Sequence, residues 1–275
     1  MKLREVMLLN GILYNSEAWH GVTKEDVKTL EAIDESLIRA LLKAHAKTAR
    51  EFLYLEVGAT PIKWIISQRR VNYLKHIIQK EDDELVKKVY IAQRDDPTSG
   101  DFVKLVEKDM EDLNVTYEQV ASMDKIKLKK TLKSNATNAA FQELKEKLKK
   151  HKSVKHMKYE HFEIQSYLQS KILHPEEAHV VTALRSQCVK NVRSNFRKMY
   201  NDRLNCPLKC NIEVVSIDTQ EHLLQCKKLS IENPLKLSIE SVFADVVQQE
   251  QIGQLVYKII KQRSRLLEEI MGGNP

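Results

Sequence analysis

Apolar residues recur at steps of three and four along most of the chain, and this spacing is typical of amphipathic helices. It predicts helices over residues 23–46, 62–78, 83–94, 101–113 and 116–123, and a further one over 241–270. Residues 3–19 also favour a helix, with Gly11 as a weak point. Residues 124–150 carry a long apolar row that predicts one helix, or two if the poor helix-forming segment SNATN at 134–138 breaks it.

Several predicted helices begin at capping residues. Thr23 is followed three residues later by Asp26, which is a variant of the capping box. Thr60 and Pro61 predict an N-cap followed by a proline in the first turn, and Pro175 predicts a similar start for a helix that runs to residue 185 or further. The helix at 23–46 is expected to bury the apolar face formed by Val27, Leu30, Ile33, Leu37 and Leu41.

The composition agrees with a helical protein that has a substantial core. The 275 residues include only 7 glycines and 6 prolines, and 42% of them are hydrophobic. A single short stretch, NIEVVSI at 211–217, is typical of a strand. We therefore predict a mainly α-helical fold with a multi-helix array over 1–158, a basic helical segment over 159–205, a small lobe over 206–230 and one or two helices over 231–275.

Three of the four cysteines lie close together near the C-terminus, in the pattern Cys206-x3-Cys210-x11-His222-x3-Cys226. Zinc prefers four tetrahedral nitrogen and sulfur ligands, and a short cysteine pair supplies two of them from one knuckle. Three thiolates and one imidazole leave no open coordination position, so we expect a structural Zn²⁺ and not a catalytic one. The lobe at 206–230 is therefore predicted to be a CCHC zinc knuckle.

The second half of this motif is expected to lie on a helix. Asp218 as N-cap and Glu221 three residues later form a capping box, and His222 and Cys226 then point the same way. The alternatives are a disulfide, which is less common in a reducing compartment, and buried structural cysteines beside a surface histidine. Cys188 lies outside the pattern and is expected to be a core thiol.

The net charge of +7 is unevenly distributed. Residues 124–158 hold twelve lysines against three acids, and residues 181–210 hold seven lysines and arginines against one acid. Such localised positive charge is typical of a surface that binds a polyanion. For residues 124–158, a solvated lysine-rich helix face explains the pattern equally well.

The basic run at 181–210 leads into the cysteine cluster, so its side chains are candidates for phosphate contacts. Lys190, Arg193 and Arg197 share one face if the preceding helix continues that far. Arg69 and Arg70 either contact nucleic acid or pair with acids of the helix at 23–46. The candidate nucleic-acid-binding residues are Arg69, Arg70, Arg185, Lys190, Arg193, Arg197, Lys198, Arg203 and Lys209.

The segment DTQEHLLQC at 218–226 resembles the cysteine–histidine segment near the C-terminus of reverse transcriptases from non-LTR retrotransposons. Further segments resemble the same region in the same order: LLNGILYNSEAW at 8–19, LEVGATPIKWIISQRRVNYLKHII at 55–78, SGDFVKLVEKDMEDL at 99–113 and ALRSQCVKNVRSNF at 183–196. The knuckle CPLKC is one residue longer than the C-P-x-C of that pattern, and the eleven-residue loop is long. The resemblance implies the thumb- and linker-like helices and the zinc knuckle that follow the polymerase, in a region that helps to bind element RNA and target DNA.

The polymerase chemistry itself is not expected in this chain. Two-metal catalysis needs paired aspartates at a strand turn, whereas the pairs in EDDE at 81–84 and RDDP at 94–97 adjoin a helix start and a loop. No nuclease constellation or phosphate-binding glycine loop is apparent in the sequence. We therefore expect a non-catalytic module that binds RNA, DNA or both. The alternative is a helical protein-interaction or structural module with a zinc clip.

The remaining expectations concern location and stacking residues. No apolar run approaches the roughly 20 residues of a membrane span, and Glu5 and Asn10 interrupt the apolar start of the chain. We expect no membrane contact, no small-molecule substrate, and a location in the nucleus, the cytoplasm or both. Tyr14, Phe196 and Tyr200 either stack on bases or pack in the core.

Overall fold

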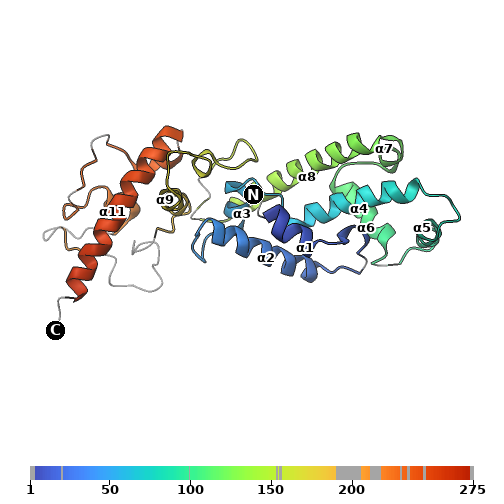
Figure 1. Cartoon of the computed structure of the whole chain (residues 1–275), viewed down its shortest axis with the longest axis horizontal. Helices are drawn as coiled ribbons and strands as arrows, with labels where there is room; N and C mark the ends of the chain where they lie inside the picture. Colours follow the sequence, from blue (N-terminus) through green and yellow to red (C-terminus); the bar gives the residue numbers. More distant parts are fainter. Residues whose placement is uncertain are drawn as a thin grey trace. The chain divides into compact units, whose positions relative to one another are not determined.

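The computed structural model describes residues 4–19, 21–98, 100–152, 154, 157–189, 206–210, 218–229, 231–233, 236–243 and 246–272. This part of the chain is mainly helical and contains no strand, which confirms the predicted fold class at that level. The segment predicted as a strand, 211–217, lies outside the described residues. Two compact units are present (Figure 1): unit 1 comprises Met1–Ile38, Tyr54–Lys147 and Tyr159–Glu163, and unit 2 comprises Arg39–Leu53, Leu148–Lys158 and Ile164–Pro275.

The helices follow the predicted order, with differences at the N-terminus. Residues 3–19 do not form the expected single helix but a π-helical turn (Arg4–Leu9), α1 (Asn10–Ile12) and a 3₁₀ turn (Ser16–Ala18). Unit 1 further holds α4 (Ile62–Ile78), α5 (Leu85–Asp95), α6 (Phe102–Asp112), α7 (Tyr117–Ser122) and nearly all of α8 (Lys125–Leu148). The helices α2 (Lys24–Leu41) and α3 (Arg50–Glu56) contribute to both units.

Unit 2 holds the remaining helices of the described chain. They are α9 (Pro175–Arg185), the short α10 (Gln220–Leu223) and the long α11 (Val246–Gly272), with 3₁₀ turns at Ser166–Leu168 and Ile239–Phe243. None of the described helices combines the length and the hydropathy that a membrane span requires.

The core of unit 1 forms between α4, α6 and α8, and Figure 1 shows α8 running beside α4. On α8, every fourth residue from Leu128 to Leu148 is buried, which gives one continuous apolar row. The helix does not break at 134–138. Asn135 Nδ2 donates to the Leu113 carbonyl at 2.8 Å, and Ala136 and Ala140 are fully buried, so tertiary contacts hold this segment in the helix.

Two predicted helix starts have different outcomes. The capping box at Thr23 is confirmed, because Thr23 N donates to Asp26 Oδ2 at 2.9 Å and Asp26 N donates to Thr23 Oγ1 at 3.1 Å. The predicted cap at Thr60 is wrong, because Pro61 is the N-cap of α4 and makes no side-chain capping bond. The proline still fits there, since a helix start tolerates a residue without a backbone N–H.

The buried face of α2 differs from the predicted one. Ile33 and Leu41 are 44% and 40% exposed, whereas Glu31, Asp34 and Ile38 are buried. The apolar spacing was therefore a good guide to the helix and a poor guide to its rotation about its own axis.

The reason is a charged network in the core of unit 1. The Asp34 carboxylate is fully buried and accepts from Arg4 Nε and Arg4 Nη2, each at 2.6 Å, and from Tyr54 Oη at 2.9 Å. Arg4 Nη2 also donates to the Thr60 carbonyl at 2.8 Å. A buried carboxylate is tolerated only where it is paired and hydrogen-bonded, so α2 turns its Asp34 side toward Arg4.

In unit 2, α9 packs closely on α11 (Figure 1). The α9 start is as predicted, with Pro175 in the first turn and His174 N donating to Glu177 Oε2 at 2.9 Å. The two helices lie close together at Gly253 of α11. A β-carbon on this residue would lie 2.8 Å from Val181 Cγ2.

We expect Gly253→Ala to destabilise the protein by about 1–3 kcal/mol, because the added methyl group overpacks the contact between α9 and α11. The measurement is thermal unfolding followed by circular dichroism. Gly11→Ala is the matched control, since nothing lies within 4 Å of the corresponding β-carbon. Equal melting temperatures for the two variants would contradict the close packing described here.

Candidate metal centre

The four side chains predicted to hold a metal lie together in unit 2. The sulfur atoms of Cys206, Cys210 and Cys226 and a ring nitrogen of His222 all lie within 4.8 Å of one another. Cys206 Sγ lies 3.8 Å from Cys226 Sγ, and Cys210 Sγ lies 3.3 Å from His222 Nε2. These residues form a candidate metal site.

The distances fit a shared cation and exclude the disulfide alternative. A disulfide joins its sulfurs at about 2.05 Å, and all four cysteines are free. Two sulfurs that each lie about 2.3 Å from one tetrahedral zinc are separated by about 3.8 Å. Three sulfurs and one imidazole nitrogen are also a donor set that structural zinc sites use.

The first two ligands are positioned by a tight turn. Lys209 N donates to the Cys206 carbonyl at 3.1 Å, and Lys209 adopts a φ of +48°. This left-handed backbone turns the chain so that Cys210 comes back toward Cys206. The side chain of Lys209 is exposed at the tip of the knuckle.

The second pair of ligands is positioned differently from the prediction. Thr219, and not Asp218, caps α10, because Thr219 Oγ1 accepts from His222 N at 3.1 Å. The expected capping box between Asp218 and Glu221 is therefore wrong. The helix ends at Leu223, so Cys226 lies beyond it in the following turn.

Asp218 instead links the cysteine cluster to α11. Its carboxylate is fully buried and accepts from Arg263 Nη2 at 2.6 Å, while Arg263 itself is 1% exposed. Gln220 Nε2 makes a second link, to the Leu184 carbonyl of α9 at 3.4 Å. The apolar residues of the lobe share one core with α9 and α11, so the lobe does not depend on its own side chains alone.

The environment of the ligands opposes charge in the absence of a cation. Burial raises the pKa of the Cys226 thiol to about 12 and also raises the pKa of Cys206. Burial lowers the pKa of His222, which favours the neutral imidazole that a metal needs. A metal ion must therefore displace thiol protons, and the sulfurs can carry negative charge only when a cation compensates it.

Three of the arginines predicted to contact nucleic acid have internal partners. Arg70 Nη1 donates to Asp109 Oδ2 of α6 at 2.5 Å, and not to an acid of α2. Arg69 donates to the Leu13 carbonyl, and Arg185 donates to a backbone carbonyl at 2.8 Å. Arg70 and Arg185 are only 5% and 3% exposed, so both support the fold. Contact of these arginines with nucleic acid stays a prediction.

The helix α9 ends near the start of the basic run. The helix ends at Arg185, and Gln187 adopts a φ of +53°. The helix α9 itself therefore does not carry Lys190, Arg193 and Arg197, and a face shared by these three residues stays a prediction. The predicted residues in this run that lie outside the described part of the chain are Lys190, Arg193, Arg197, Lys198 and Arg203.

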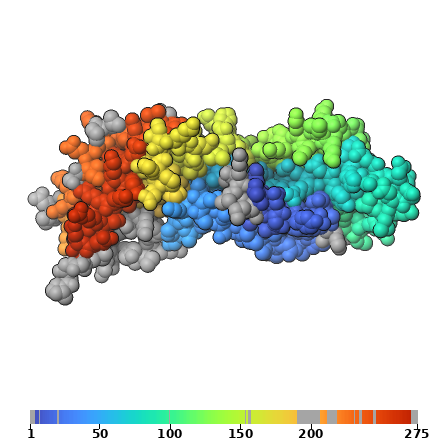
Figure 2. All heavy atoms as spheres, in the orientation of Figure 1, coloured from blue at the N-terminus to red at the C-terminus, as the bar shows by residue number. Residues whose placement is uncertain are grey.

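Exposed lysines lie beside the metal ligands and at the start of α8. Lys227 and Lys228 directly follow the last ligand and are exposed, as is Lys209. Sequence reasoning missed this pair, although its position beside Cys226 was a usable signal. The first turns of α8 carry five exposed lysines, namely Lys125, Lys127, Lys129, Lys130 and Lys133. Figure 2 shows α8, in light green, on the visible face of unit 1.

Of the aromatic residues considered for base stacking, Tyr14 is 74% exposed and so does not pack in the core. Phe196 and Tyr200 lie outside the described residues. Comparison of the chain with protein-family models, curated proteins and solved structures gives no match.

Proposed function

We propose that the protein is a non-catalytic module that binds RNA or DNA and that contains a structural zinc ion. Cys206, Cys210, His222 and Cys226 would hold the zinc, which would replace thiol protons and fix the knuckle between α9 and α11. The donor set and the 3.8 Å between the Cys206 and Cys226 sulfurs, which matches the value expected for tetrahedral zinc, support the choice of metal. With four protein ligands the ion has no position for a reacting water, so its role is structural.

The observation that carries the nucleic-acid proposal is the exposed lysine row at the start of α8. Five lysines stand exposed between residues 125 and 133, and the sequence has no acid from residue 125 to residue 142. The Asp124 carboxylate is occupied at the helix start, where it accepts from Lys127 N at 2.8 Å and from Ile126 N at 3.1 Å. Asp124 is thus the only carboxylate close to this row in the sequence, and the ammonium groups further along the helix, from Lys129 to Lys133, are available to phosphates.

The test is the salt dependence of binding to a single-stranded oligonucleotide. Each phosphate contact contributes about 0.7 to the slope of log affinity against log salt concentration. Replacing Lys129, Lys130 and Lys133 by glutamine is expected to reduce that slope by about 2, because three contacts are lost. Fluorescence anisotropy at several salt concentrations measures the slope.

The matched control removes three exposed lysines from other helices, Lys88, Lys104 and Lys258, and should leave the slope nearly unchanged. Equal slopes for the two triple variants would contradict the assignment of the surface to α8. Absence of binding even at about 50 mM salt would favour the alternative, a helical protein-interaction or structural module.

We further propose that the chain derives from the region that follows the polymerase in non-LTR retrotransposon reverse transcriptases. This proposal rests on the ordered resemblance of five segments, from 8–19 to 218–226. Reading the surrounding genomic sequence for a polymerase coding region upstream of residue 1 tests it.

A further inference from the structure

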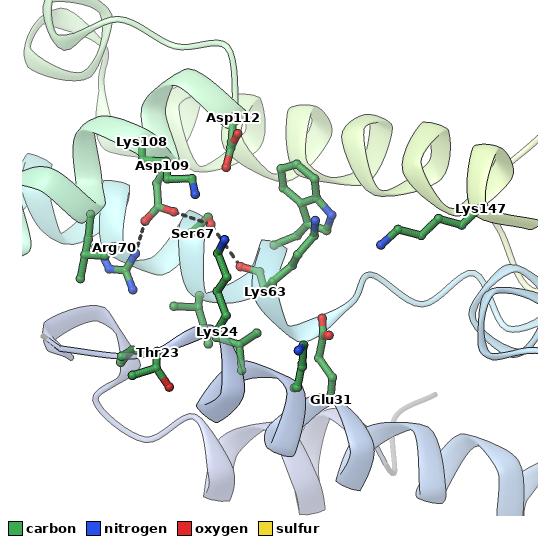
Figure 3. A pocket seen from close by; sticks show the side chains of 16 residues that line it. Thr23, Lys24, Glu31, Lys63, Ser67, Arg70, Lys108, Asp109, Asp112 and Lys147 are labelled. Carbon is green, nitrogen blue, oxygen red and sulfur yellow. Dashed lines mark hydrogen bonds and ion pairs between the residues drawn. The ribbon is translucent and has the colours of Figure 1, made fainter. Parts of the chain in front are cut away.

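A pocket in unit 1 has the charge pattern of an anion-binding site, and the proposed function does not use it. The pocket measures about 580 Å³ and lies between α2, α4, α6 and α8 (Figure 3). Six of its lining side chains are cationic and three are acidic. This volume falls within the range of small-ligand sites, which is about 300–1,000 Å³.

Once Asp109 is paired with Arg70, the lining holds five lysines against two further acids, Glu31 and Asp112, so an excess of positive charge remains. Asp109 accepts from Arg70 at 2.5 Å and from Ser67 Oγ at 2.7 Å, so this carboxylate and the only arginine of the lining satisfy each other. Figure 3 shows this pair at the α6 side of the pocket, turned toward each other. The positive charge that remains comes from lysines.

A carboxylate behind the pocket orients two of these lysines. Glu143 accepts from Lys63 Nζ at 2.5 Å and from Lys147 Nζ at 2.6 Å, and also from Trp64 Nε1 at 3.1 Å. Burial acts to raise the pKa of Glu143, but the hydrogen bonds from Lys147 and Lys63 outweigh it and lower the pKa. The carboxylate is thus ionised at neutral pH, and it holds two ammonium groups with a single negative charge.

Two further lysines have no hydrogen-bond or ion-pair partner among the described residues. Lys24 enters from α2 and Lys108 from α6, and both are exposed to solvent. Figure 3 shows their side chains reaching toward the same space as Lys63. Lys24, Lys63 and Lys108 thus line one pocket from three helices, with Lys63 also paired to Glu143, and such a group of cations attracts a multiply charged anion more strongly than a single carboxylate.

The floor of the pocket is apolar. Val27, Trp64, Ile66 and Leu105 line it, and Trp64 is 8% exposed. A ligand that fits both parts needs a compact group with two negative charges and an apolar or planar body. We propose that the pocket binds a nucleotide-sized phosphomonoester, with the phosphate among Lys24, Lys63 and Lys108 and the rest of the ligand against the apolar floor.

The ligand chemistry has two sources, a free nucleotide and the 5′-phosphorylated end of a nucleic acid. The proposal is independent of the α8 lysine row, because Lys147 is the only α8 lysine that lines the pocket and it lies outside the row. The two proposals therefore fail separately. The decrease in the slope of log affinity against log salt concentration in the α8 variant tests the nucleic-acid surface. The need for a phosphate group on the ligand tests the pocket.

The experiment titrates the full-length chain with adenosine 5′-monophosphate and with adenosine. Trp64 serves as the fluorescent reporter in a Trp19→Phe background, and calorimetry confirms the stoichiometry. We expect the monophosphate to bind at one site and adenosine to bind at least about tenfold more weakly, since charge-assisted contacts to the phosphate carry the affinity. Equal affinity for the two probes, or no binding of the monophosphate at millimolar concentration, would overturn the proposal.

The variant Lys24→Gln/Lys108→Gln should raise the dissociation constant of the monophosphate about tenfold or more. Both side chains are exposed, so the fold is expected to be retained, and circular dichroism checks this. The control Lys88→Gln/Lys104→Gln, outside the pocket, should leave the constant within about twofold. A similar loss in both double variants would overturn the assignment to this pocket.

A pair of short RNA oligonucleotides, one with a 5′-phosphate and one with a 5′-hydroxyl, separates the two sources. Tighter binding of the phosphorylated oligonucleotide than of the free monophosphate supports the proposal and assigns a nucleic-acid end. Tighter binding of the free monophosphate supports it and assigns a nucleotide. In either case, the Lys24→Gln/Lys108→Gln variant should no longer prefer the phosphorylated probe over its unphosphorylated counterpart. A preference for the phosphorylated probe that survives in this variant would overturn the proposal.

Discussion

Cys226→Ser is expected to abolish binding of the proposed zinc ion and to unfold the cysteine lobe of unit 2. The buried sulfur lies 3.8 Å from Cys206 Sγ and completes the four-ligand set. Structural zinc contributes on the order of 10 kcal/mol of binding free energy at neutral pH, so its loss removes a large part of the free energy that orders the lobe. Elemental analysis of the purified chain should give one zinc for the wild type and none for the variant.

Cys188→Ser provides the matched control for this experiment. Cys188 is a free, half-buried cysteine of the same unit that lies outside the cluster. The Cys188→Ser variant should keep one zinc per chain, and its melting temperature should be close to that of the wild type. A strong chelator should lower the melting temperature of the wild type and of this control, and should leave Cys226→Ser unaffected. Full zinc content in Cys226→Ser would refute the proposed ligand set.

Asp34→Asn is expected to destabilise unit 1 by about 3–5 kcal/mol, because it leaves the Arg4 guanidinium buried without its carboxylate. Arg4 is 4% exposed and Asp34 is not exposed at all, so water cannot replace the lost partner. For a chain of this size each kcal/mol corresponds to roughly 2–4 °C, and the melting temperature of unit 1 should fall by about 10 °C. Thermal unfolding measured by calorimetry resolves this change.

The double variant Arg4→Met/Asp34→Leu should lose less stability than Asp34→Asn, since it removes both charges together. Glu25→Ala is the control for a simple loss of charge. Its ion pair with Lys28 is exposed, with side chains 78% and 65% accessible, and such pairs contribute at most about 1 kcal/mol. If Asp34→Asn had the same melting temperature as Glu25→Ala, the buried network would have no stabilising role.

Periodic spacing predicted the helices whose apolar row faces a single core. It failed for α3, whose residues Phe52, Leu53, Tyr54 and Leu55 are all fully buried. A helix that is covered on all sides shows no alternation between apolar and polar positions, so periodicity cannot identify it. The rotation of α2 was also missed, because the Arg4 that pairs with Asp34 is thirty residues away in the sequence.

The metal ligands were predictable because their residue types and spacing carry the chemistry. The residues that position these ligands were not predictable from the sequence. Asp218 has the composition of a helix cap and precedes a helix, yet it pairs with Arg263, forty-five residues further on. Similarly, nothing in the local sequence shows that Lys24, Lys63 and Lys108 line one pocket, because they belong to three separate helices.

The pair between Asp218 and Arg263 makes the cysteine cluster and α11 thermodynamically dependent on each other. Ordering of the segment that carries the ligands and docking of the last helix share one buried contact. By reciprocity, whatever factor metal binding adds to the docking of α11, docking of α11 adds to the affinity for the metal. A molecule that holds α11 in place would therefore raise the affinity of the cysteine cluster for a metal ion that this molecule does not contact.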